Sequence, residues 1–271
     1  MFDCSWQSSE TVDLFYEEMG RPENPPLLIL HGFFAASRNW RQMAKKLAGN
    51  YHVFVPDLRN HGASPHADRM DYQLMAADIL AFIDRHGLQQ VSLLGHSMGG
   101  KIAMWFSLNC PGRVKELVIV DIAPVSYTHS FNSIIKALQT LPLQAIHNRK
   151  QAEAHLLKVL HEQSFAQFLL QNLQLKDGRY SWRIDLEVFQ RCADAIIAFP
   201  DTAQSQPFSG SVLLLAGGCS QHVKPAYYAD IYRLFPACHI NIIEASGHWL
   251  HVERPVEFLR EVQNFLTKKA K

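Results

Sequence analysis

The sequence predicts an α/β fold in which a mostly parallel sheet is covered by helices on both faces and carries an inserted helical cap. Short apolar runs alternate along the chain with segments of helical period. The runs are apolar throughout, which is typical of strands buried on both faces. The alternation stops near residue 125 and resumes at residue 211. A sheet domain interrupted by an insertion explains both features.

Six apolar runs are the predicted strands of the sheet. Their strand–helix–strand order favours parallel pairing with right-handed crossovers. Residues 11–19, which precede Pro22 and Pro25, alternate enough to predict an edge hairpin. The strands are expected at residues 27–30, 51–55, 91–94, 117–120, 212–215 and 239–243, and the helices at 40–47, 72–85, 98–108, 227–235 and 255–266.

The interrupted stretch predicts the cap. No comparable strand run occurs between residues 125 and 208, and amphipathic helical stripes take its place. Asp177 and Gly178 mark a turn within it. We expect an α/β core of residues 1–124 and 210–271, with residues 125–209 forming the helical cap. The cap helices are expected at residues 131–141, 165–173 and 186–199.

Composition excludes several classes of protein. Of 271 residues, 48% are apolar and 19% are charged, which excludes a disordered or fibrous chain. Lys and Arg number 26 against 25 Asp and Glu, so the net charge of +1 predicts no nucleic-acid partner. The lysines at the end of the chain are expected to be a solvated tail rather than a binding arm. They are Lys268, Lys269 and Lys271.

The cysteines and the hydropathy predict a cytoplasmic protein with no membrane partner. The cysteine number is odd, the spacing is wide and C-x-x-C is absent, which argues against a disulfide framework and a thiolate zinc site. The first ten residues show no signal-peptide pattern, and no apolar run reaches the roughly 18 residues of a membrane span. The cysteines are Cys4, Cys110, Cys192, Cys219 and Cys238.

The pattern Gly95-x-Ser97-x-Gly99 predicts a nucleophile. It directly follows a predicted strand and directly precedes a predicted helix. A serine at so sharp a turn adopts a strained backbone that pushes its hydroxyl clear of the sheet. Side chains two residues away would collide with neighbouring backbone, which calls for glycine there. The helix beginning at Met98 also points its positive end at the reacting oxygen. The alternative is a glycine-rich turn that contains a serine by chance.

A serine hydroxyl needs a base to take its proton, and His248 is the candidate. It follows the last predicted strand, at the carboxyl edge of the sheet, whereas His251, His222 and His96 have weaker contexts among the 14 histidines. With an ordinary histidine pKa, hydrolysis would fall below about pH 6.5. The alternative is a structural histidine.

The third group must be a carboxylate that orients the imidazole. The loop at residues 216–223, after the penultimate strand, contains none. Asp121, at the end of the strand at 117–120, offers one and keeps the chain order Ser97, Asp121, His248. The alternative for Asp121 is a strand-end cap that binds backbone amides.

Two backbone N–H groups are expected to form an oxyanion hole. One is the amide of Met98 and the other is the amide of Phe33, in the His31-Gly32-Phe33-Phe34 loop after the first parallel strand. Phe34 and Trp249 are expected to line the substrate pocket, with core packing as the alternative. The polar cluster at residues 57–64 is interpreted as a loop network rather than as catalytic. No metal-ligand spacing is present, so no cofactor and no metal are expected.

These motifs together resemble the α/β-hydrolase fold superfamily over nearly the whole chain. A more specific set resembles the YbfF-type bacterial serine esterases: residues 59–62, 99–101, 121–124 and Gly217-Gly218-x-Ser220. The resemblance implies serine esterase activity on acyl esters or acyl thioesters. It also implies a triad acid after the sixth strand of the family's sheet, and a helical cap.

The sequence therefore predicts a cofactor-independent carboxylic ester hydrolase that works through an acyl-enzyme on a small-molecule acyl ester or thioester. Alternatives on the same three residues are an acyl thioesterase and a C–C or lactone hydrolase. A non-catalytic ligand-binding protein of the same fold is the alternative from another class. Haloalkane and epoxide chemistry is excluded, because it resembles enzymes with an aspartate nucleophile and position 97 is serine.

Overall fold

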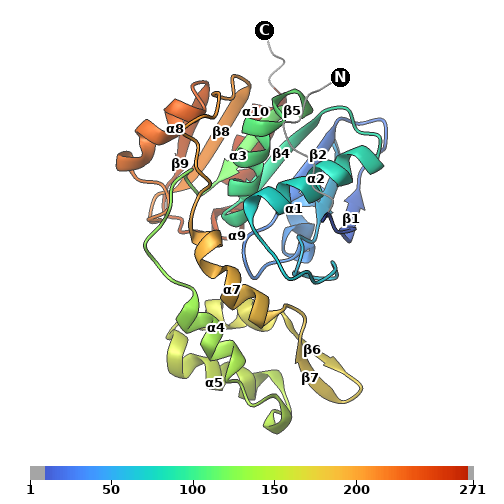
Figure 1. Ribbon diagram of the computed structural model, residues 1–271, viewed down its shortest axis with the longest axis vertical. Helices are drawn as coiled ribbons and strands as arrows, with labels where there is room; N and C mark the ends of the chain where they lie inside the picture. Colours follow the sequence, from blue (N-terminus) through green and yellow to red (C-terminus); the bar gives the residue numbers. More distant parts are fainter. Residues whose placement is uncertain (1–9, 268–271) are drawn as a thin grey trace.

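The computed structural model describes residues 10–267 (Figure 1). The predictions for Cys4, for the start of the chain and for the lysines Lys268, Lys269 and Lys271 lie outside the described residues. In the described part, no helix combines the length and the apolar character that a membrane crossing requires.

A seven-stranded sheet forms the centre of the described residues, in the order β1-β3-β2-β4-β5-β8-β9. Neighbouring strands are parallel except β1, which is antiparallel to β3. All six predicted strands are present. The strands are β1 Tyr16–Met19, β2 Pro26–Leu30, β3 His52–Pro56, β4 Val91–His96, β5 Val114–Val120, β8 Ser211–Gly217 and β9 Cys238–Ile243.

The predicted edge hairpin at residues 11–19 is wrong. Only Tyr16–Met19 forms a strand there, and it pairs with β3. The reason lies in β2, which makes parallel pairs with β3 on one side and with β4 on the other. Because both edges of β2 are occupied, the preceding segment does not pair with β2 and joins the sheet at the outer edge of β3 instead.

Helices cover both faces of the sheet, as predicted. Along β5, Leu117 and Ile119 enter one apolar core while Val118 and Val120 enter the other. The alternation follows from the two-residue period of a strand. The first core is closed by α2 Tyr72–Arg85, α3 Met98–Asn109 and α8 Tyr228–Leu234, and the second by α1 Arg41–Leu47, α9 Leu250–Glu253 and α10 Pro255–Thr267.

The segment between β5 and β8 forms a lobe beyond the carboxyl edge of the sheet, at the bottom of Figure 1. It is not wholly helical, because a hairpin lies between its third and fourth helices. Asp177 and Gly178 form the hairpin turn with φ of 50° and 74°. The elements are α4 Asn132–Gln139, α5 Arg149–Leu160, α6 Gln163–Leu170, β6 Leu173–Lys176, β7 Arg179–Trp182 and α7 Leu186–Ile197.

The end of α7 is fastened to the core by polar side chains from two core helices. Tyr72 Oη donates to the carbonyl of Ile196 at 2.6 Å. Lys101 Nζ donates to the carbonyls of Ile197 at 2.6 Å and Ala198 at 2.8 Å. Lys101 is fully buried, and burial lowers the pKa of its ammonium to about 7. Lys101 thus joins the lobe to α3, the helix that begins directly after Ser97.

One cysteine departs from the sequence prediction. Cys110 is disulfide-bonded, whereas Cys192, Cys219 and Cys238 are free thiols. A single bond is not a disulfide framework, yet the wide cysteine spacing gave no sign of it.

Candidate active site

Ser97 occupies the turn between β4 and α3 with φ of 53° and ψ of −120°. This is the strained conformation that the glycine pattern predicts. A Cβ at Gly95 would lie 2.3 Å from the carbonyl oxygen of Gly99, and one at Gly99 would lie 2.3 Å from that of Leu30. Both glycines are therefore required by close backbone approach.

Asp121 and His248 meet at the carboxyl edge of the sheet, although 127 positions separate them. His248 Nδ1 lies 2.7 Å from Asp121 Oδ2, so the ring donates its Nδ1–H to the carboxylate. That tautomer leaves Nε2 as the proton acceptor. Asp121 is wholly buried, at 0% exposure, while His248 is partly exposed. A carboxylate without access to water needs its remaining lone pairs filled by the protein.

Further donors fill those lone pairs. The amide of Gly217 donates to Asp121 Oδ1 at 2.9 Å, and Ser220 Oγ donates to Oδ2 at 2.5 Å. Burial raises the pKa of Asp121, and these two hydrogen bonds oppose the rise. Asp121 itself has φ of 49°, which turns it sharply out of β5.

His248 is held from its backbone side as well. His96 Nε2 lies 2.8 Å from the carbonyl oxygen of His248, and the two ring centroids are 4.6 Å apart. His96 immediately precedes Ser97, so this contact joins the serine turn to the histidine loop. Burial lowers the pKa of His248 to about 4, with a smaller contribution from the charge of His129. Among the hydrogen bonds of residues 10–267, none joins Ser97 Oγ to the His248 ring; such bonds often tighten only when substrate binds.

The loop after β2 lies against Ser97. A Cβ built at Gly32 would be 3.3 Å from Ser97 Cβ. His31 fixes this loop: its Nδ1 lies 2.8 Å from the carbonyl oxygen of Gly32, and its Nε2 accepts the amide of Leu58 at 3.0 Å. Met98 opens α3, where an amide has no partner within the helix. The hydrogen bonds found within the described part of the chain give neither the Phe33 nor the Met98 amide an acceptor.

Aromatic rings from the lobe pack against Phe33 and Phe34, in the loop after β2, and against Trp249, which follows His248. Phe33 and Phe34 are buried against Phe131 and Phe189, with ring centroids 4.4 to 5.9 Å apart across that contact. Trp249, directly after His248, packs against Phe165 at 5.9 Å and Phe168 at 5.5 Å, both on α6. The lobe therefore presents apolar rings to the loop after β2 and to the residue that follows His248.

The polar cluster at residues 57–64 forms a loop network, as interpreted from the sequence. Asp57 accepts the amides of Ser37 at 2.6 Å and Ala63 at 2.7 Å. Arg59 makes a bidentate ion pair with Asp78 at 2.6 and 2.8 Å, and both side chains are buried. These contacts brace the loop that supports His31.

A family model of the α/β-hydrolase fold matches residues 25–255 of the chain. The chain belongs to the α/β-hydrolase family. This confirms the resemblance drawn from the motifs and the predicted fold class.

Several relatives of this α/β hydrolase carry names that describe ester hydrolysis. The sn-1-specific diacylglycerol lipase ABHD11 of Mus musculus is 38% identical over 251 residues, which cover 89% of this chain and 81% of the relative. Esterase YbfF of Escherichia coli is 31% identical over 244 residues, which cover 90% and 93%. A solved structure of a marine microorganism esterase superposes with a TM-score of 0.90 at 34% identity, covering 94% of this chain and all of that one. The prediction of an enzyme that hydrolyses ester bonds is confirmed.

Sequence reasoning missed two partners of Asp121 in this α/β hydrolase. The sequence indicates Ser220 only as part of a family motif, and His222 only as a weaker candidate for the base. The positive φ of Asp121 and the turn after β8 bring both to the carboxylate. Periodicity carries no information about such turns. His251, the remaining weaker candidate, instead stacks on Trp40 at 4.1 Å.

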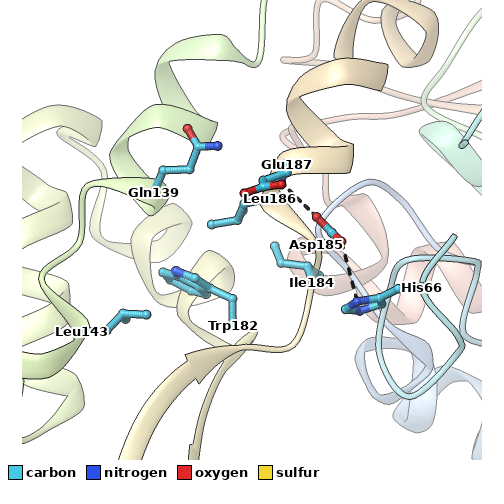
Figure 2. A pocket seen from close by; sticks show the side chains of 8 residues that line it. All are labelled: His66, Gln139, Leu143, Trp182, Ile184, Asp185, Leu186 and Glu187. Atoms are coloured by element: carbon cyan, nitrogen blue, oxygen red, sulfur yellow. Dashed lines mark hydrogen bonds and ion pairs between the residues drawn. The ribbon is translucent and has the colours of Figure 1, made fainter. Parts of the chain in front are cut away.

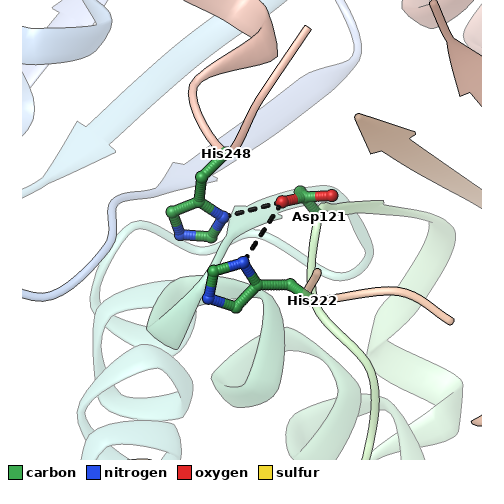
Figure 3. A group of neighbouring side chains, drawn as sticks. All are labelled: Asp121, His222 and His248. Atoms are coloured by element: carbon green, nitrogen blue, oxygen red, sulfur yellow. Dashed lines mark hydrogen bonds and ion pairs between the residues drawn. The ribbon is translucent and has the colours of Figure 1, made fainter. Parts of the chain in front are cut away.

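Asp121, His222 and His248 are also the described residues that could hold a metal ion, since their ligand atoms lie within 4.8 Å of one another (Figure 3). Ligand atoms about 2.0–2.2 Å from one zinc ion stand more than 3 Å apart in tetrahedral geometry. The 2.7 Å between His248 Nδ1 and Asp121 Oδ2 is a hydrogen-bond distance. The arrangement suits proton transfer better than metal binding.

A second concave region lies away from these residues, between the lobe and a core loop (Figure 2). Its volume is about 610 Å³, and none of the predicted site residues lines it. Asp185 caps α7 by accepting the amides of Glu187 and Val188 at 3.0 Å, and lies 3.9 Å from His66. Asp185 thus serves as the N-cap of α7.

Proposed function

We propose that this α/β hydrolase cleaves carboxylic esters with Ser97 as nucleophile, His248 as general base and Asp121 as the acid of a catalytic triad. His248 Nε2 takes the proton of Ser97 as the hydroxyl attacks the ester carbonyl. The same ring then returns the proton to the leaving alkoxide. His248 then activates a water molecule, which hydrolyses the acyl-enzyme and releases the carboxylic acid product.

The oxyanion of each tetrahedral intermediate is assigned to the amides of Phe33 and Met98. Support comes from the packing of Gly32 against Ser97 and from the absence of an acceptor for either amide among residues 10–267. Two such donors stabilise the negative charge at the moment it develops.

The single observation that carries this proposal is the 2.7 Å contact between His248 Nδ1 and a wholly buried Asp121. A merely structural carboxylate at a strand end would be satisfied by backbone amides. Asp121 instead gives one oxygen to the imidazole that follows the last strand. That contact fixes the tautomer in which Nε2 can accept a proton.

The substrate is proposed to carry an apolar acyl group, bound under residues 125–209 acting as a cap. The aromatic rings of Phe34 and Trp249, with their partners on the lobe, support an apolar acyl site. The mouse relative is named a diacylglycerol lipase, which makes acylglycerols a substrate class to include.

A paired series of p-nitrophenyl esters and acyl-CoA thioesters, from short to long chains, tests the proposal, with diacylglycerol as a third substrate. Wild-type enzyme is expected to turn over the esters with a preference for one range of apolar chains. Turnover confined to thioesters would make the protein a thioesterase. No turnover of any substrate would favour a ligand-binding protein.

A further inference from the structure

His222, in the loop after β8, lies beside the candidate base and acid (Figure 3). Its ring stacks on that of His248, with centroids 3.9 Å apart and planes 24° from parallel. Its Nδ1 lies 3.6 Å from Asp121 Oδ2, the same oxygen that His248 contacts. Two imidazoles therefore face one buried carboxylate oxygen, and His248 alone of the two is within hydrogen-bond distance of it.

The backbone of His222 is held without help from its side chain. Its amide donates to Ser220 Oγ at 3.2 Å, and its carbonyl accepts Tyr127 Oη at 2.6 Å. The hydroxyl of Tyr127 in turn accepts the amide of Ala123, two residues beyond Asp121. Any residue except proline at position 222 could make these bonds. The placement of the imidazole on His248 is a separate feature.

The groups that face His222 favour its neutral form. From its own loop it meets Ser220, whose Oγ lies 3.2 Å from His222 Nδ1. His248 and His129 bring further rings, at 3.9 and 6.1 Å between centroids, and Lys101 adds a nearby positive charge from α3. Asp121 alone opposes these effects, and burial, followed by the charges of His248, His129 and Lys101, lowers the pKa of His222 to about 4.

We propose that His222 is a positioning residue for His248: its neutral ring covers one face of the base and keeps Nδ1 of His248 on Asp121. The proposal rests on the proposed function of Ser97, Asp121 and His248. A proton on His222 would compete for the same carboxylate oxygen and repel the imidazolium that forms during catalysis. Protonation of either ring therefore stops the reaction, and the two rings titrate as a pair.

His222→Phe and His222→Ala separate the two contributions, because phenylalanine keeps a flat ring over His248 and alanine removes it. His147→Ala, on an exposed residue of the lobe, is the control. His222→Phe is expected to retain most of the wild-type kcat at neutral pH. His222→Ala is expected to lose on the order of tenfold in kcat with little change in KM, since positioning acts after binding.

The acid side of the pH profile of kcat/KM decides the proposal. In the wild type and in His147→Ala, the slope of log(kcat/KM) against pH should steepen from one toward two as the pH falls, because two protons inactivate the enzyme. In His222→Phe the slope should stay at one. Circular dichroism marks the pH range in which each variant remains folded. Identical slopes for the wild type and His222→Phe would overturn the proposal.

NMR chemical shifts of the His222 and His248 rings, followed against pH in Ser97→Ala, test whether the two rings titrate as a pair without the need for turnover. Coupled titration in two steps supports the proposal, and independent titration of the two rings contradicts it. If wild-type enzyme hydrolyses no substrate, or if Ser97→Ala remains active, the proposed function fails instead, and this titration still reports on the histidine pair.

Discussion

Asp121 shows how one residue combines burial, backbone strain and hydrogen bonding. It has a positive φ, no solvent exposure and an oxygen shared by His248 and Ser220. The positive φ and the burial are unfavourable for an isolated carboxylate. The hydrogen bonds from His248, Ser220 and the Gly217 amide offset the cost of burial.

Asp121→Asn should reduce kcat by about 10⁴-fold, because an amide in this position no longer fixes the Nδ1–H tautomer of His248. Steady-state hydrolysis of a p-nitrophenyl ester measures the loss. Glu116→Gln, near the partly exposed start of β5, is a matched control that should stay near wild type. Activity in Asp121→Asn within tenfold of wild type would reassign Asp121 to backbone capping.

The pH dependence follows from His248. A base must be neutral, and burial lowers the pKa of His248 from 6.5 to about 4. The sequence-based expectation of a fall below about pH 6.5 therefore moves to lower pH. We expect kcat/KM to stay constant at pH values just below 6.5 and to fall as the pH approaches 4. The substrate is an ester that does not itself titrate in this pH range. A midpoint at or above pH 6.5 would mean that His248 is solvated in the working enzyme.

At the scale of elements, the β4–α3 junction and the lobe helices α4, α6 and α7 were predictable, whereas α5 and the β6–β7 hairpin were not. Apolar runs marked every parallel strand, and β2, β3 and β4 are buried along almost their whole length on both faces, whereas the edge strand β9 is partly exposed. The hairpin of β6 and β7 pairs only with itself and leaves Leu175 61% exposed, so no apolar run announces it. Likewise α5 buries only Ala152 and Leu156, which is too little for a helical stripe to be noticed.

Gly99→Ala tests the close packing at this junction. The added Cβ would meet the backbone of Leu30 and His31 at 2.3 and 2.6 Å, displacing the end of β2 and the loop that carries Phe33. Thermal or denaturant unfolding should show a loss of at least about 2 kcal/mol, with activity reduced further. At Gly49 a Cβ meets nothing within 4 Å, so Gly49→Ala is the control and should change stability by less than about 1 kcal/mol. Equal effects of the two substitutions would contradict this account.

For the whole molecule, Lys101 helps to attach the lobe, and the sequence marks it only as the last residue of the family motif at 99–101. Its buried ammonium bonds the end of α7, and the Tyr127 ring lies 4.7 Å away. Tyr127 also reaches the carbonyl of His222. A continuous set of contacts thus joins the lobe to the loop beside Asp121. Such long-range polar contacts follow from the assembled fold and leave no local trace in the sequence.

Lys101 should give the protein a distinctive pH dependence of stability. Its pKa is about 7 in the folded protein against an ordinary 10.5, so between these values the unfolded chain binds more protons. The free energy of unfolding should therefore rise with pH across this window, by up to about 1.4 kcal/mol per pH unit. Lys101→Met should lose that rise in urea titrations, while Lys45→Met, exposed on α1, should keep it. Parallel curves for the wild type and Lys101→Met would contradict the account.

The most direct measurement identifies the residue that carries the acyl group. Enzyme quenched during turnover of a slowly deacylated ester, or treated with a fluorophosphonate, is digested and mapped by mass spectrometry. We predict one adduct, on Ser97, and none in Ser97→Ala, whose turnover should fall by about 10⁵-fold or more. An adduct on another residue, or full turnover by Ser97→Ala, would contradict the assignment of Ser97 as nucleophile.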